Sequence, residues 1–166
     1  HSASFWHYDK GQTSKFSWVR QGVDINGTLT QHCGSTTAGY THGGGPPTVA
    51  DFNGDGTPDV ALAGGIGYAV LDGAKIVNSA ITNPNTIMWT ASTTDCSSAA
   101  TGSSVFDFDG DGKAEVVYSD ENHLRIYEGP TGKVLWSTCN TTGTLEEYPL
   151  VADVDNDGHA DIVVVS

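Results

Sequence analysis

The chain has 166 residues, enough for one domain with a sizeable core, and combines 21 glycines with only 16% charged residues. This composition favours short strands and many turns over long helices. The formal net charge of −13 argues against nucleic acid or an anionic membrane surface as a partner. The sequence also lacks the apolar run of roughly 18 residues that a membrane-spanning helix needs.

The N-terminal residues 1–47 contain three segments that predict β-strands. These are residues 2–8, which are rich in aromatic side chains, residues 16–20 and residues 28–33. A glycine-rich stretch with Pro46 and Pro47 follows and predicts a loop.

Three later segments repeat one acidic pattern, which begins at Asp51, Asp107 and Asp153. With the first Asp as position 1, each has oxygen-bearing side chains at positions 1, 3 and 5, glycine at position 6 and an acid at position 9. Such side chains, with the carbonyl of position 7, form a cage of the kind that Ca²⁺ prefers. The sequence therefore predicts three calcium sites. Their expected ligands are Asp51, Asn53, Asp55, Thr57 and Asp59; Asp107, Asp109, Asp111, Lys113 and Glu115; and Asp153, Asp155, Asp157, His159 and Asp161.

Two alternatives to a calcium site share part of this pattern. A solvated Asp/Gly turn without metal would leave three or four carboxylates per loop to repel one another. An EF-hand is excluded because position 12, a bidentate Glu in that motif, is Leu62, Tyr118 or Val164 here. The flanking residues also predict β-strands rather than amphipathic helices. The pattern therefore indicates strand–calcium loop–strand hairpins.

The acidic loops recur at intervals of about 50 residues, which is the length of one four-stranded propeller blade. Residues 48–103 form the first repeat, residues 104–148 the second and residues 149–166 half of a third. Trp89 and Trp136 occupy equivalent places in the fourth strands, which indicates packing between blades. The expected strands are 48–51, 59–62, 67–71 and 86–90 in the first repeat, and 104–107, 115–118, 123–127 and 134–139 in the second.

These loops and their strand context resemble the FG-GAP/VCBS repeats, whose calcium loops join the first two strands of a blade, as in integrin α-subunit propellers. The resemblance covers most of residues 48–166. It implies an all-β propeller with blades of four antiparallel strands and a calcium loop between strands one and two. The chain lacks clear Phe-Gly and Gly-Ala-Pro halves, so it is more similar to the bacterial VCBS type, and integrin-style ligand binding is not carried over.

The N-terminal strands can form a half blade in two registers. In the first register, residues 16–20 and 28–33 are strands three and four, and residues 2–8 are an extra strand without a blade. In the second register, Tyr8 and Trp18 align with Tyr127 and Trp136. We favour the first register.

Two whole blades and two half blades fall short of the four to eight blades of a closed propeller. The chain is therefore expected to be a fragment of a longer propeller, or to be completed by other copies of itself. Copies can close a ring, or they can form a filament in which the strand at residues 5–8 adds to a neighbouring sheet.

The calcium pattern suits an exported protein, in which cysteines can form disulfides and asparagine sequons can carry glycans. One disulfide among Cys33, Cys96 and Cys139 with one free thiol is expected, and all three pairings stay open. A zinc site that includes His32 is a weaker alternative. Asn26 and Asn140 begin glycosylation sequons. Because calcium is millimolar outside cells and the chain does not begin with Met, we expect a processed or excised extracellular or cell-surface protein.

Catalytic motifs are not evident in the sequence. The segment at residues 42–45 has no accompanying nucleophile elbow. Glu146 and Glu147 are adjacent and are expected to point apart. The sequence therefore predicts a non-enzymatic, calcium-stabilised structural or adhesion module, such as a subunit of a surface fibre or matrix. The alternatives are a carbohydrate- or protein-binding propeller and an accessory propeller region of a larger polysaccharide-active enzyme.

Overall fold

The computed structural model describes residues 2–8, 11, 16–24, 44–64, 66–98, 100–144 and 147–166. Within these ranges the chain forms two four-stranded and two two-stranded sheets, all with antiparallel neighbours. The helical elements are short: α1 (Gly73–Val77) and the 3₁₀ turn η1 (Asn83–Thr86). No helix among the described residues is long and apolar enough to cross a membrane.

The first four-stranded sheet, called blade 1, contains β3 (Thr48–Ala50), β4 (Asp59–Ala63), β5 (Gly67–Leu71) and β6 (Ile87–Ser92), in that spatial order. The four predicted strands are confirmed: the bounds of β5 are exact, and β3 and β4 each end within one residue of the prediction. Thr86 ends η1, so β6 starts one residue later than predicted, and it ends two residues later. Both α1 and η1 lie in the connection between β5 and β6.

The second four-stranded sheet, called blade 2, contains β7 (Ser103–Phe106), β8 (Glu115–Ser119), β9 (His123–Tyr127) and β10 (Val134–Cys139). The sequence predicts the bounds of β9 and β10 correctly and those of β7 and β8 to within one residue. The strand pair β11 (Leu150–Ala152) and β12 (Asp161–Val163) follows, as expected for half a repeat.

The N-terminal strands β1 (Ser2–Tyr8) and β2 (Phe16–Asp24) pair with each other. Tyr8 lies opposite Phe16, and Trp6 lies opposite Trp18. This pairing agrees with the second register, and it gives residues 2–8 a partner strand, which the first register did not. The short connection favours the local pairing because closing a short loop costs little entropy. The predicted strand at residues 28–33 lies outside the described residues.

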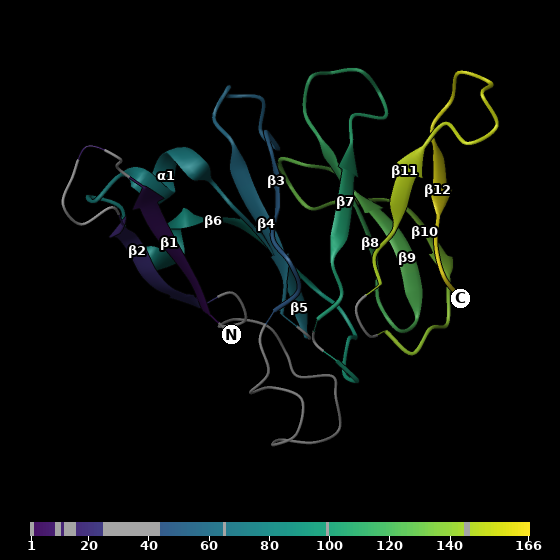
Figure 1. Cartoon of the computed structure of the whole chain (residues 1–166), viewed down its shortest axis with the longest axis horizontal. Coiled ribbons are helices and arrows are strands. Elements are labelled where there is room, and N and C mark those ends of the chain that lie inside the picture. The colour runs from purple at the N-terminus through teal and green to yellow at the C-terminus, as the bar shows by residue number, and fades with distance from the viewer. Residues whose placement is uncertain are drawn as a thin grey trace.

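The sheets follow one another in chain order across the molecule, from β1 and β2 at one side to β11 and β12 at the other (Figure 1). Alternate residues of blade 1 face opposite sides because side chains alternate along a strand. Tyr68 and Val70 of β5 join the core shared with blade 2, whereas Ala69 and Leu71 join a second core with α1 and Phe5 of β1. Blade 1 is therefore covered on both faces.

Aromatic rings fill the core between blade 1 and blade 2. The Tyr68 ring lies 5.9 Å from that of Trp89, 5.0 Å from that of Tyr118 and 6.4 Å from that of Tyr127. The indole N–H of Trp89 donates to the carbonyl of Gly129, in the turn before β10, at 2.6 Å. The prediction that Trp89 packs between blades is confirmed.

Trp136, the equivalent residue of blade 2, is different because 47% of it is exposed. Blade 1 is covered by side chains of β8 and β9 and by the turn that follows β9, whereas β11 contacts β7 of blade 2. Every residue of β10 is exposed among the described part of the chain. The fold is thus an incomplete, propeller-like set of antiparallel four-stranded sheets, with no closed sheet in the described ranges.

Candidate metal sites in three acidic loops

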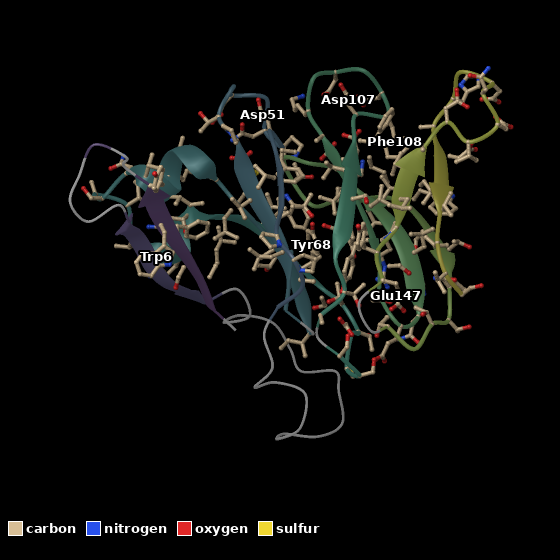
Figure 2. All side chains as sticks on the ribbon, viewed as in Figure 1. Trp6, Asp51, Tyr68, Asp107, Phe108 and Glu147 are labelled. Atoms are coloured by element: carbon tan, nitrogen blue, oxygen red, sulfur yellow. The ribbon has the colours of Figure 1, made fainter. Side chains whose placement is uncertain are left out.

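Three loops join the first strand of a sheet to its neighbour: loop 1 (residues 51–59), loop 2 (residues 107–115) and loop 3 (residues 153–161). All three project from the same edge of the molecule (Figure 1), and Figure 2 shows Asp51 and Asp107 at that edge. A repeated local sequence thus places three acidic loops side by side.

The first Asp of each loop holds the turn by accepting backbone N–H groups. In loop 2, Asp107 accepts from Gly110, Asp111 and Gly112 at 2.7–3.1 Å. Asp51 has the same partners in loop 1, namely Gly54, Asp55 and Gly56, and Asp153 accepts from Asp157 and Gly158 in loop 3. Both partners of each hydrogen bond lie within the same loop, which explains why a nine-residue pattern predicts its conformation.

Left-handed backbone angles explain the small residues of the loops. Position 6 has φ of 81° at Gly56, 85° at Gly112 and 88° at Gly158, a region that glycine enters without steric cost. Position 4 is also left-handed, and there loop 3 has Asn156 with φ of 63°. Asn tolerates this region better than other side chains.

The acid at position 9 closes each loop from the second strand. Phe52 N–H donates to Asp59 at 3.0 Å, Phe108 N–H to Glu115 at 2.9 Å and Val154 N–H to Asp161 at 3.0 Å. Asp59 is fully buried and Glu115 is 4% exposed. Burial raises the pKa of both carboxyl groups, against the opposing effect of these hydrogen bonds.

Loops 2 and 3 each bring three carboxylates together. Oxygen atoms of Asp107, Asp109 and Glu115 lie within 4.8 Å of one another, and so do those of Asp153, Asp155 and Asp161. Hard oxygen donors at this spacing suit Ca²⁺, which takes six to eight oxygen ligands. The donor sets of loops 2 and 3 therefore fit a calcium ion.

The acid at position 5 does not join these groups. Asp111 accepts the backbone N–H and the ammonium of Lys113, which lower its pKa. Asp55 accepts N–H groups from Thr57 and Asn53, and the backbone bond from Thr57 lowers the pKa of Asp55. Asp157 accepts the backbone N–H of His159 at 2.8 Å. The residues at position 7 thus contact the position-5 acids through their backbone N–H.

Loop 1 is arranged differently from the other two. One oxygen of Asp59 accepts from Phe52 and the other accepts from Gly73 N–H, at the start of α1, at 2.8 Å. Position 3 is Asn53, an amide rather than a carboxylate. Among the described residues, the carboxylates of loop 1 do not gather as those of loops 2 and 3 do.

Two of the other predicted site residues, Cys139 and Asn140, lie outside the three acidic loops. Asn26 and Cys33 are outside the described residues, and Cys139 carries a free, exposed thiol. The Asn140 side-chain amide donates to Ser119 Oγ at 3.0 Å and to the Val165 carbonyl at 3.2 Å. A glycan on this nitrogen would disturb these bonds.

Two buried carboxylates that sequence reasoning missed tie together the loops that precede β7 and β9. Asp95 accepts from the Thr101 N–H, the Ser98 side chain and the Thr144 hydroxyl. Asp120 accepts from the N–H groups of Thr94 and His123 and pairs with Arg125. An Asp beside small polar residues, as in an Asx turn, is the signal for both. Their role is structural because their carboxylate oxygens accept hydrogen bonds from backbone N–H groups.

Comparisons with known proteins agree with this geometry. Residues 107–164 match the family model of the FG-GAP-like repeat. The crystal structure of the V. cholerae biofilm matrix protein Bap1 is similar to the chain, with a TM-score of 0.56 and 31% sequence identity over 66% of the chain. The match spans 16% of Bap1. No protein of curated function matches the sequence. The residues that match the FG-GAP-like repeat include loops 2 and 3.

Proposed function

We propose that the chain is a non-enzymatic structural module of an extracellular surface or matrix, and that calcium in its three loops stabilises its blades. The carboxylate groups of loops 2 and 3 are the observation that carries this proposal. The similarity to a biofilm matrix protein supports the matrix role and the extracellular location.

Calcium would act between the first two strands of each sheet. In loop 2, Asp107 follows β7 and Glu115 begins β8, so one ion shared by both would join the two strands. In loop 3, Asp153 and Asp161 have the same relation to β11 and β12. The ion would also remove the repulsion among the gathered carboxylates.

The size of this effect follows from linkage between binding and folding. An ion that binds only the folded state adds RT ln(1 + [Ca²⁺]/Kd), which is about 1 kcal/mol per site when calcium exceeds Kd several-fold. Three sites would add about 3 kcal/mol to a typical stability of about 5–15 kcal/mol. Calcium would therefore be a large part of the margin by which the chain stays folded.

Thermal unfolding in calcium and in excess EDTA tests the calcium proposal. We expect the melting temperature to fall by about 6–12 °C on chelation, from roughly 2–4 °C per kcal/mol for a domain of this size. Refilling with Ca²⁺ should restore it, and Mg²⁺ at equal concentration should restore less because it demands stricter geometry. An unchanged melting temperature in EDTA would reject the proposal.

We also propose that further blades, from a longer chain or from other copies, complete the incomplete sheets. The support is the exposed apolar surface of β10, the edge strand of blade 2, which includes Val134, Leu135 and Trp136. Blade 1 shows how such a face is covered, since its Trp89 lies against the β9–β10 turn. Light scattering after size exclusion, compared between the chain and its Trp136→Ser variant, tests whether copies associate. Loss of the association in the variant is expected, and a monomeric parent chain would restrict the partner to further blades of a longer chain.

We further propose that Cys33 and Cys96 form the disulfide. Cys96 is in disulfide form and Cys139 is free, although Cys33 itself lies outside the described residues. Non-reducing peptide mapping should recover a Cys33–Cys96 peptide pair, and a pair that includes Cys139 would contradict the assignment.

A further inference from the structure

Lys113 binds both oxygens of one carboxylate in loop 2. Its ammonium lies 2.5 Å from Asp111 Oδ2, and its backbone N–H donates to Asp111 Oδ1 at 2.9 Å. Lys113 is at position 7, where loop 1 has Thr57 and loop 3 has His159. Loop 2 is therefore the acidic loop whose sequence contains a lysine.

Loop 1 holds the stem of Lys113 in place. The Lys113 methylenes lie across Gly54, where an added Cβ would be 3.1 Å from Lys113 Cγ. The neighbouring Ala114 N–H donates to the Asp51 carbonyl at 3.1 Å, which fixes the backbone of loop 2 against loop 1. The position of the ammonium is thus set by contacts from two blades.

We propose that Lys113 is a built-in counter-cation that competes with calcium for Asp111 and lowers the calcium affinity of loop 2. This inference rests on the proposed function, because it assumes that loop 2 binds calcium. Position 7 of such a loop offers its backbone carbonyl as a ligand. The side chain there can change without removing a ligand, so it is free to tune the site.

Two opposite effects follow from one ammonium group. Without metal, it neutralises Asp111 and reduces repulsion within a loop that holds four carboxylates. To bind an ion, Asp111 would have to give up its contact with the ammonium, and the ammonium would repel the ion. Lys113 therefore stabilises the empty loop and weakens the filled one.

Loop 3 provides a matched site for the reverse change. It has the same scaffold, since its Asp157 accepts the His159 N–H at 2.8 Å as Asp111 accepts that of Lys113. His159 is exposed. Loop 3 thus has four carboxylates and neither lysine nor arginine.

Calcium titration of the whole chain, followed by amide NMR, tests the proposal. The Gly112 and Gly158 amides, which donate to the first Asp of loops 2 and 3, report each loop separately. Lys113→Gln should raise the affinity of loop 2 by up to about fivefold, the equivalent of an exposed ion pair. His159→Lys should lower that of loop 3 by a similar factor. Lys133→Gln, which removes the same charge outside the loops, should change neither.

The melting temperature supplies a second measurement. Lys113→Gln should lower the melting temperature in EDTA and enlarge the increase that calcium produces. A purely structural role of Lys113 would not enlarge that increase. Unchanged loop 2 affinity in Lys113→Gln, with calcium still binding to the parent chain, would overturn this inference alone. If neither glycine amide of the parent chain responds to calcium, both this inference and the proposed function fail.

Discussion

Replacing Glu115 by Gln is expected to have opposite effects with and without calcium. Glu115 is 4% exposed, accepts the Phe108 N–H at 2.9 Å and lies with Asp107 and Asp109 in one oxygen cluster. Gln keeps an oxygen for Phe108 and nearly the same volume, but it removes the charge. The substitution therefore separates the hydrogen bond from the carboxylate that would bind the ion.

With calcium present, the variant should lose most of the stabilisation from loop 2. That is about 1 kcal/mol when calcium exceeds Kd several-fold, or a fall of roughly 2–4 °C in melting temperature. In EDTA the direction reverses, because the variant removes a buried charge that lies beside two other carboxylates. Burial and these neighbours raise the pKa of Glu115, which shows that its charged form is disfavoured in the empty loop.

Differential scanning fluorimetry of the parent chain and the Glu115→Gln variant, in calcium and in EDTA, measures both directions. The account predicts a lower melting temperature for the variant in calcium and an equal or higher one in EDTA. An equal fall in both conditions would refute the reasoning, because it would show that Glu115 acts only through its structural contacts. Glu128→Gln, on the turn after β9, is a control that changes the same charge outside the loops.

Two further predictions concern blade packing and pH. Gly132→Ala should destabilise the chain by about 2–4 kcal/mol in chemical denaturation, because φ is +71° and the added Cβ would lie 2.4 Å from the Trp89 ring. Gly110 has φ of +75° and nothing within 4 Å of an added Cβ, so Gly110→Ala should lose only the backbone contribution, about 1 kcal/mol of unfolding free energy. An equal loss of stability in the two variants would contradict the packing argument. The pKa of Glu115 is raised above 4.5, so its contribution to the stability of the calcium-free chain is fully present below about pH 4.5 and is lost as pH rises through the folded-state pKa. Because calcium must displace that proton, the calcium affinity of loop 2 should fall as pH is lowered through the same window. Titration calorimetry at several pH values measures this affinity, and a pH-independent affinity would contradict the prediction.

Much of the fold is predictable because the loops are encoded locally. Asp107 contacts N–H groups three to five residues ahead of it, so the sequence alone contains both partners of each bond. Once the loops are placed, alternating apolar residues define the strands that flank them. The sequence therefore predicts β7 to β10 closely, together with the acidic loops that contain the proposed metal ligands.

Long-range contacts explain what the sequence does not predict. Asp59 accepts from Gly73, fourteen residues away, and this bond turns a predicted ligand of loop 1 toward α1. The pairing of β1 with β2 depends on a choice between two registers that hydrophobic patterns leave equivalent. The exposure of Trp136 depends on which chain segment covers β10, a property of the tertiary arrangement rather than of the local sequence.

The ion pair of Lys113 with Asp111 shows the same limit at a single position. The sequence places Lys113 where only its carbonyl is expected to bind metal, and it gives no direction for the side chain. The contact of the Lys113 stem with Gly54 comes from a neighbouring blade and fixes that direction. The sequence therefore predicts which residues make up a loop better than it predicts the contacts of their side chains.

Native mass spectrometry of the chain after equilibration with millimolar calcium counts the bound ions directly. The account predicts three calcium ions per chain, with the occupancy of loop 2 lost in Glu115→Gln and the other two retained. A folded chain that carries no calcium under these conditions would contradict the claim that these loops are calcium sites.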